Sequence, residues 1–222
     1  MDRAGELRAD SEAIERLWNS ALILEVGKGR VRSTSEGLTF LTAAEAIGGE
    51  RYFLGIDRDS DQPYFAWASG RVDAEVEDYL TLRELAGGLE PLHLEVTMHA
   101  IALSNWHDSH PHCPKCGAPT RIDLAGAARY CEKDERQHHP RTDAAVIVLV
   151  KDREDRILLG HQPVWPDGRF STFAGFLEPG ETFEQCVARE VFEEAGVKLS
   201  EVKYLGSQPW PFPASVMIAF EA

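Results

Sequence analysis

The segment AGFLEPGETFEQCVAREVFEEAGV, residues 174–197, concentrates acidic side chains in a short stretch that contains one cation, Arg189. Thr182 followed three residues later by Gln185 forms a capping box, which predicts that a helix begins directly after Thr182. Gly196 is a typical residue just past the end of a helix. The segment therefore predicts a loop followed by a helix, with carboxylates on both.

Glu190 and Glu194 are separated by one helical turn. At about 100° per residue, both are predicted to lie on the apolar face, beside Val187 and Val191. Two carboxylates on an inward face repel each other and lose hydration, whereas a solvated charge run would face away from the core. Arg189 is expected to point to another side, so a hard divalent cation with oxygen ligands best explains the pattern.

The loop before this helix carries Glu178 and Glu181, which can approach the same point. Gly175 and Gly180 are expected to permit a tight turn that folds the loop back onto the start of the helix. Cys186 lies on the inward face of the predicted helix. We interpret it as a small core residue and not as a nucleophile.

The fixed positions of the segment resemble the Nudix box, G-x5-E-x7-R-E-U-x-E-E-x-G-U with U aliphatic, from Gly175 to Val197 at every position. The resemblance implies an α/β/α sandwich that hydrolyses a nucleoside diphosphate linked to another group. It also implies a catalytic set formed by Glu181, Arg189, Glu190, Glu193 and Glu194.

Further implications of the resemblance concern the ions and the loop. Glu190 and Glu194 would bind Mg²⁺ or Mn²⁺, with Glu193 as a further ligand or water activator. The backbone carbonyl of Ala174 would be another ligand. A salt bridge between Glu181 and Arg189 would hold the loop against the helix.

A second constellation is Cys113-x-x-Cys116 followed by Cys131, which is the pattern of a zinc ribbon in which each CxxC knuckle offers two thiolates. The second knuckle reads CEKD, so Asp134 stands where a fourth cysteine is expected. A carboxylate oxygen of Asp134 could complete a structural zinc site, and the imidazoles of His112, His138 or His139 could also fill this place. The alternative is a ribbon that folds without metal.

The stretch SQPWPFPAS, residues 207–215, contains three prolines that stiffen the backbone around Trp210 and Phe212. Exposed aromatic rings on a stiff loop can stack on a planar base, although such a loop can also simply pack on the core. Downstream of a Nudix box, this stretch resembles the signature of the NADH pyrophosphatases, the NudC-like branch of the Nudix superfamily. The segment NWHDSHPHCPKCG resembles the ribbon entry of the same family.

This second resemblance implies a homodimer that converts NAD(H) and water to NMN(H) and AMP, and in some members removes NAD caps from RNA. The nucleotide pocket would then include Gln208, Pro209, Trp210, Pro211, Phe212, Pro213, Ala214 and Ser215. His139 is a further candidate for substrate binding. Arg83 is a weaker one, because a solvated helix arginine is an equally good interpretation.

The amino-acid composition limits the kinds of molecule that the protein is expected to bind. The net charge of the 222-residue chain is -14 and no basic stripe is present, which argues against contacts with an RNA body but not with an NAD-capped 5′ end. The longest apolar run, residues 144–150, is too short to span a bilayer, and the N-terminus has no secretory signal pattern. Cysteines of this number and spacing fit a reducing compartment, so we expect a cytoplasmic protein.

The elements that must position these residues predict an α+β fold. A strand-rich N-terminal α/β domain, 1–106, would precede the ribbon segment, 107–140, and a Nudix domain with a mixed sheet, 141–222. Residues 1–20 are expected to be a mobile arm or a short helix, 21–76 short strands, and 91–110 a helix. His107, His110 and His112 are expected to be polar hairpin residues. The Nudix pattern continues beyond residue 222, so this chain is expected to be less stable and less active than a longer parent.

Two other functions fit the same residues. One is a different Nudix activity, such as hydrolysis of ADP-ribose or of a dinucleoside polyphosphate. The other is a catalytically inactive nucleotide sensor or zinc-ribbon scaffold. The intact carboxylates of the Nudix segment argue against the second.

Overall fold

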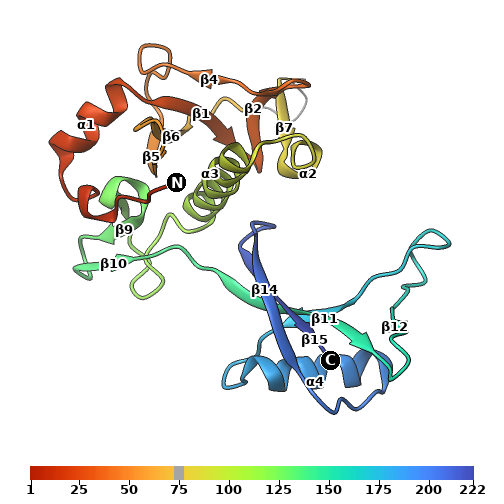
Figure 1. Cartoon of the computed structure of the whole chain (residues 1–222). Coiled ribbons are helices and arrows are strands. Elements are labelled where there is room, and N and C mark those ends of the chain that lie inside the picture. Colours follow the sequence, from red (N-terminus) through yellow and green to blue (C-terminus); the bar gives the residue numbers. More distant parts are fainter. Residues whose placement is uncertain (73–77) are drawn as a thin grey trace. The chain divides into compact units, whose positions relative to one another are not determined.

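The computed structural model describes residues 1–72 and 78–222 (Figure 1). The chain forms two compact units, residues 1–141 and 142–222. The finer division of the first unit into an N-terminal domain and a ribbon segment stays a prediction, and the end of the strand-rich stretch predicted to residue 76 lies outside the described residues. Among the described residues, no helix is long and apolar enough to cross a membrane.

The first unit is built on a seven-stranded sheet in which β1 runs parallel to β6 and the other described pairs are antiparallel. Its strands are β1 (Leu22–Gly27), β2 (Arg30–Thr34), β3 (Gly37–Leu38), β4 (Phe40–Leu41), β5 (Glu50–Ile56), β6 (Pro63–Ala68) and β7 (Tyr79–Thr81). Apolar and aromatic residues fill the central strands, which explains why both faces of β1, β5 and β6 are buried.

Short helices close the edges of this sheet. They are η1 (Gly5–Leu7), α1 (Ser11–Asn19) and α2 (Leu82–Leu85). Asp10 caps α1 by accepting a hydrogen bond from the Ala13 N–H, and Trp18, only 2% exposed, inserts into the core against Phe65. Of the two alternatives for residues 1–20, the short helix is therefore present.

The long helix α3 (Pro91–Ser109) begins with proline in its first turn and packs against β1, β5 and β6. It carries His107, which was expected on a hairpin. That expectation is wrong: the His107 ring is buried and stacks on Tyr52 with centroids 4.4 Å apart. The helical spacing of the apolar residues continues through this histidine, which explains the outcome.

The ribbon is a small antiparallel sheet of β8 (Arg121–Asp123), β9 (Ala128–Cys131) and β10 (Arg136–His138), with η2 (Leu124–Gly126) between its first two strands. Gly126 has φ of 97° and lies so close to Tyr52 that any side chain would overlap its backbone and ring. Glycine is therefore required here, because the ribbon approaches β5 at this point.

The second unit contains a five-stranded mixed sheet, in which β11 is parallel to β15 and antiparallel to β12 and β13. Its elements are β11 (Asp143–Lys151), β12 (Ile157–Leu158), β13 (Phe173–Phe176), α4 (Phe183–Ala195), β14 (Lys203–Trp210) and β15 (Ser215–Glu221). In Figure 1, α4 lies along one face of this sheet. Val187 and Val191 of α4 share a core with Val146, Val148 and Phe220 of the sheet. The predicted α+β class with a mixed sheet is confirmed.

Candidate active site

Helix α4 begins and ends where the sequence predicts. The Thr182 hydroxyl accepts a hydrogen bond from the Gln185 N–H at 3.3 Å, and the Gln185 side chain accepts one from the Thr182 N–H at 2.8 Å. Gly196 ends the helix in the left-handed conformation. Cys186 is fully buried, and burial raises the pKa of its thiol to about 11, so it is a core residue and not a nucleophile.

Arg189 is the central residue of the site. Its Nε and Nη2 donate to the two carboxylate oxygens of Glu181 at 2.6 and 2.9 Å, which confirms the predicted salt bridge. Its Nη1 donates to Glu190 at 2.7 Å and to Glu193 at 3.3 Å, and its Nη2 also donates to the carbonyl of Phe176. The expectation that Arg189 points away from the other carboxylates is therefore wrong, because the forked guanidinium reaches several acceptors at once.

The loop before α4 is held by the same cation. Hydrogen bonds from the Arg189 guanidinium, joined by one from the Glu178 N–H at 2.9 Å, lower the pKa of Glu181 to about 2. Gly180 has φ of 94° and supplies the predicted turn. The loop is thus fixed to the helix by a charged side chain that stays ionised at any physiological pH.

Gly175 has a different role from the one expected. It lies in β13, where a side chain would overlap the carboxyl group of Glu190. This glycine provides space for a carboxylate, whereas the prediction assigned it to the turn. Glu190 is consequently half-buried between β13 and the Arg189 guanidinium.

Glu194 was predicted on the apolar face, and this is wrong: the residue is exposed and lines a groove, and it does not join the buried core. Its carboxylate nevertheless accepts a hydrogen bond from the Ala174 N–H of β13. Partial burial, together with the negative charges of Glu190 and Glu193, raises the pKa of Glu194. The last turns of α4 therefore retain negative charge that Arg189 alone does not neutralise.

A groove of about 390 Å³ lies beside Glu194 and Ala174. Its other wall is formed by the loop after β12, where Nδ1 of His161 donates to the Arg169 carbonyl at 2.8 Å and Arg169 stacks over Trp165. The sequence reasoning missed His161. In this part of the sequence, the only indication of a functional loop was the aromatic residues of the segment PVWPDGRF, residues 163–170.

The residues present fit a divalent cation. Carboxylate and carbonyl oxygens are the ligands that Mg²⁺ and Mn²⁺ prefer, and Glu190, Glu193, Glu194 and the Ala174 carbonyl offer them around one edge of α4. The guanidinium of Arg189 is already hydrogen-bonded to Glu181. A divalent cation would therefore relieve the remaining repulsion among Glu190, Glu193 and Glu194. These four residues would hold it.

In the ribbon, the sulfur atoms of Cys113, Cys116 and Cys131 all lie within 4.8 Å of one another, and they are the one such group of metal-ligand atoms among the described residues. None of these thiols is in a disulfide. Burial alone would raise the pKa of Cys113, but hydrogen bonds from the N–H groups of Cys116 and Lys115 bring it to about 6. Three converging thiols, of which Cys113 has a lowered pKa, fit zinc.

The fourth ligand of the predicted zinc site is less clearly defined than the three thiols. The Asp134 N–H donates to Cys131 Sγ at 3.3 Å, and Lys115 donates to Asp134 Oδ1 at 2.7 Å. Asp134 Oδ2 and His138 Nε2 are both buried without a hydrogen-bond partner. Buried polar atoms are normally paired, so either atom is available to a metal ion.

The proline-rich stretch forms the β14–β15 hairpin. Residues 207–210 belong to β14, 211–214 form the turn, and Ser215 begins β15. The expected loop is thus partly strand, because Gln208 pairs with Met217 and Trp210 with Ser215. The rings of Trp210 and Phe212 contact each other edge to face, 5.0 Å between centroids. Gln208 and Trp210 line a hollow of about 430 Å³ on the sheet face opposite α4.

The last two predicted substrate residues lie in the first unit. His139 is exposed after β10, and Arg83 is exposed on α2. Their roles stay predictions.

Comparisons with known proteins agree with this arrangement. The model of the NUDIX domain matches residues 140–221, and the model of the NADH pyrophosphatase zinc ribbon domain matches residues 108–138. The chain is 38% identical over 228 residues to a Mycobacterium bovis protein named NAD-capped RNA hydrolase NudC, covering all of this chain and 73% of that protein. A Chromobacterium violaceum protein of the same name is 37% identical, with 80% of this chain and 66% of that protein covered. A NUDIX hydrolase structure from Nitrosomonas europaea is 26% identical with a TM-score of 0.38, covering 50% of this chain and 65% of that one.

Proposed function

Because the chain belongs to the NudC family of Nudix hydrolases, we propose that it hydrolyses the pyrophosphate bond of NAD(H) and releases NMN(H) and AMP. The observation that carries this proposal is the Arg189-centred cluster at the groove, in which one cation serves Glu181, Glu190 and Glu193 while Glu194 borders the cavity. We also propose that an NAD-capped RNA 5′ end is a substrate, in line with the names of the two relatives.

The chemistry requires a water oxygen to attack one phosphorus atom while the bond to the bridging oxygen breaks. A Mg²⁺ or Mn²⁺ ion held by Glu190, Glu193, Glu194 and the Ala174 carbonyl would supply charge neutralisation and a more acidic water. Glu193, which is exposed and only weakly held by Arg189 at 3.3 Å, would accept the water proton. Glu181 and Arg189 would keep the loop and helix in position during turnover.

The substrate would be held by residues of the same unit. Trp210 and Phe212 would stack on a base or a nicotinamide ring, and Gln208 to Ser215 would shape the pocket. His139 and Arg83 are proposed as additional contacts from the first unit. Trp165 and His161, which border the groove next to Glu194, add aromatic surface beside the reacting phosphates.

Zinc is the second metal in this proposal, with a structural role in the ribbon. Cys113, Cys116 and Cys131 would be three ligands and Asp134 Oδ2 the fourth, since that oxygen is buried without a hydrogen-bond partner and its neighbour Oδ1 is held by Lys115. The guanidinium of Arg136 also lies near Oδ2, with its Nε 3.8 Å away. We propose further that the protein is a cytoplasmic homodimer. Size-exclusion chromatography with light scattering measures the oligomeric state.

The proposed reaction is tested by incubating the protein with NADH and Mg²⁺ or Mn²⁺, and separating the products by chromatography. Equimolar AMP and NMNH are expected. Glu194→Gln should abolish turnover and leave NADH binding intact, and Glu184→Gln, an exposed glutamate in the first turn of α4, is the matched control. Release of nicotinamide, or faster hydrolysis of ADP-ribose or a dinucleoside polyphosphate than of NADH, would contradict the proposal.

A further inference from the structure

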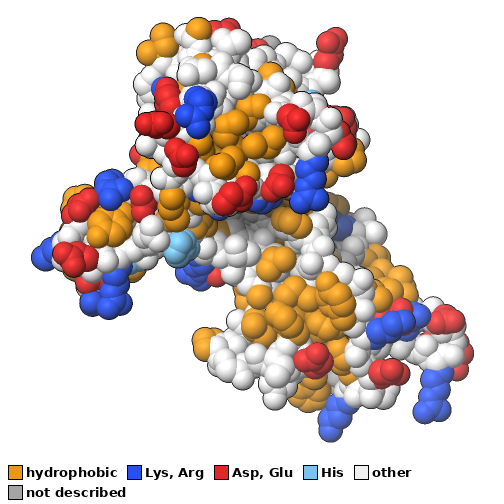
Figure 2. Space-filling model, turned by 60° about the vertical axis from the view of Figure 1, so that its left-hand side comes forward, with side chains coloured by type: hydrophobic (Ala, Val, Ile, Leu, Met, Phe, Trp, Pro, Cys, Tyr) orange, Lys and Arg blue, Asp and Glu red, His pale blue; other side chains and the backbone are white. Residues whose placement is uncertain are grey.

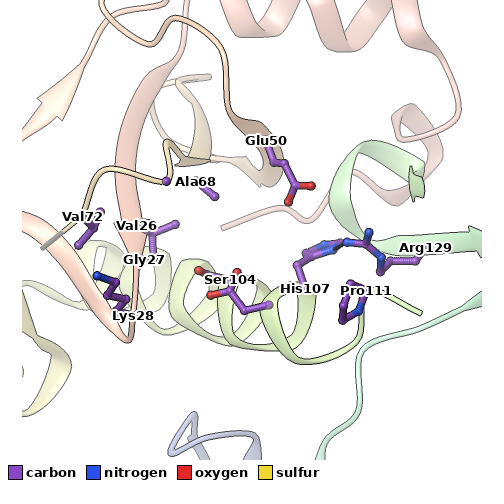
Figure 3. Close-up of a pocket in the computed structure, with 12 residues that line it drawn as sticks. Val26, Gly27, Lys28, Glu50, Ala68, Val72, Ser104, His107, Pro111 and Arg129 are labelled. Carbon is purple, nitrogen blue, oxygen red and sulfur yellow. Dashed lines mark hydrogen bonds between the residues drawn. The ribbon is translucent and has the colours of Figure 1, made fainter. Parts of the chain in front are cut away.

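The first unit also contains a hollow, with a volume of about 460 Å³, which we call the α3 pocket. The ends of β1, β5 and β6 line one side and α3 lines the other, and Pro111 and Arg129 close it (Figure 3). Its volume is within the range of pockets for small molecules. None of its residues belongs to the groove beside α4.

Ser104 is the first indication of a ligand. Its side chain lines the pocket and is 0% exposed, yet its hydroxyl has no hydrogen-bond partner. A serine inside a helix normally bonds to the carbonyl one turn back, as Ser109 does with Asn105 at 2.6 Å. A buried, unpaired hydroxyl is costly, so a molecule in the pocket would supply the missing partner.

Two carboxylates are the second indication. Glu50, at the start of β5, accepts from the Tyr52 hydroxyl at 2.7 Å through one oxygen, and Asp108 of α3 lies near it. Within residues 1–72 and 78–222, neither carboxylate is within ion-pair distance of a cation, and Asp108 makes no hydrogen bond. Asp108 is exposed in part; its partial burial, followed by the charge of Glu50, raises its pKa, as expected for two acids that lie close together.

The cations that line the pocket do not relieve this repulsion. Arg129 is buried, but its Nε and Nη2 donate to the hydroxyl and carbonyl of Thr120, at 2.7 and 2.9 Å. Its Nη1 donates to Nδ1 of His107, whose other nitrogen donates to the Gly126 carbonyl at 2.8 Å. Because Nδ1 of His107 accepts from Arg129, it carries no proton, and burial also lowers the pKa of the ring. All three guanidinium nitrogens of Arg129 therefore already have partners.

Lys28 is the remaining cation. Figure 3 shows it beside Val26 and Val72 at one end of the pocket, whereas His107 and Arg129 lie at the other end. Between the two ends the wall includes Val26, Ala68 and Val72, which are apolar. The pocket thus has an acidic, acceptor-rich region, an apolar middle and a basic end.

We propose that the α3 pocket binds a small aliphatic zwitterion whose ammonium group is held by Glu50, Asp108 and the Ser104 hydroxyl, and whose anionic group lies near Lys28. A primary ammonium group has three N–H donors, which match these three acceptors. The aliphatic chain would contact Val26 and Val72. The proposal does not depend on the reaction at α4.

Three probes of equal chain length test this assignment: 6-aminohexanoate, hexylamine and hexanoate. Binding is measured on the full chain by calorimetry and by amide chemical shifts in nuclear magnetic resonance spectra. We expect 6-aminohexanoate to bind at millimolar concentration or better and to shift the amides of Lys28, Ser104 and Asp108. Hexylamine should bind about tenfold more weakly, because it lacks the group for Lys28, and hexanoate more weakly still.

Variants identify the site. Asp108→Asn and Ser104→Ala should each weaken 6-aminohexanoate binding about tenfold or more, whereas Glu36→Gln, at an exposed acid outside the pocket, should not. Circular dichroism of each variant shows whether the fold is retained, and Asp108 is exposed enough that its substitution should not unfold the unit. The proposal is overturned if no probe binds, if hexanoate binds as well as 6-aminohexanoate, or if folded Asp108→Asn binds normally. Displacement of the probe by Mg²⁺ alone would also overturn it, because the site would then be a cation site.

Discussion

The carboxyl group of Glu190 in α4 occupies the space that a side chain at position 175 of β13 would need, so the position of Glu190 requires glycine there. The strand and the helix approach each other closely at this point, where Glu190 is also held by Arg189. This contact links the loop, the strand and the helix into one rigid site.

The first prediction concerns that contact. Gly175→Ala should displace the Glu190 carboxyl, lower NADH turnover at least tenfold and destabilise the protein by about 1–3 kcal/mol, since a methyl group has no room there. Turnover and chemical denaturation measure the two effects. Gly87→Ala, where an added methyl meets no atom within 4 Å, is the control. Normal activity of Gly175→Ala would show that turnover does not require the Glu190 carboxyl to occupy the space beside residue 175.

The second prediction concerns Glu181 and pH. Hydrogen bonds from Arg189 lower its pKa in the folded protein to about 2, below the value of about 4.3 in an unfolded chain. A depressed folded pKa gives stability that is present above the unfolded value and is lost as pH falls toward 2. Glu181→Gln should therefore lower the melting temperature at pH 7. The difference from the wild type should shrink steadily below about pH 4, and an unchanged difference at pH 3 would contradict this linkage.

The third prediction concerns Arg189. Arg189→Lys keeps the charge but loses the fork that bonds Glu181 through two atoms and reaches Glu190 and Glu193. We expect turnover to fall about tenfold or more, with a smaller change in KM. Steady-state kinetics separate the two parameters. If the Arg189→Lys variant supported full turnover, the positive charge alone would suffice and the forked geometry of the guanidinium would not matter.

The fourth prediction concerns the ribbon. Asp134→Cys should bind zinc more tightly than the wild type, because a fourth thiolate replaces an oxygen ligand, and Asp134→Ala should bind it less tightly. Metal analysis after dialysis against a chelator gives the ranking. The absorption of the Co²⁺-substituted protein should differ between three and four sulfur ligands. His138→Ala distinguishes the alternatives: if it loses zinc while Asp134→Ala does not, His138 is the fourth ligand.

The sequence predicted α4 and its caps, because capping is a local property of the chain, and the Glu181–Arg189 ion pair was expected from the resemblance to the Nudix box. Predictions from the sequence were wrong for residues whose positions depend on tertiary contacts. The surroundings of Glu194 depend on the groove that it lines together with Ala174 of β13, and the space at Gly175 depends on the close approach of β13 to α4. His107 was misplaced because its partners, Tyr52 and Arg129, come from other elements. Figure 2 shows apolar side chains gathered in patches on the face that it presents, with acidic and basic side chains around them. The composition of the chain could not have located the α3 pocket, whose lining residues come from several distant segments.

The proposed mechanism requires that water attacks a phosphorus atom of the dinucleotide at the carboxylates of α4. Turnover of NADH in ¹⁸O-labelled water, followed by mass spectrometry of the products, shows which product group carries the oxygen atom of the attacking water. We expect a single ¹⁸O atom per turnover in the phosphate group of AMP or NMNH, and none with Glu194→Gln. Label in a ribose hydroxyl, with release of free nicotinamide, would contradict the mechanism.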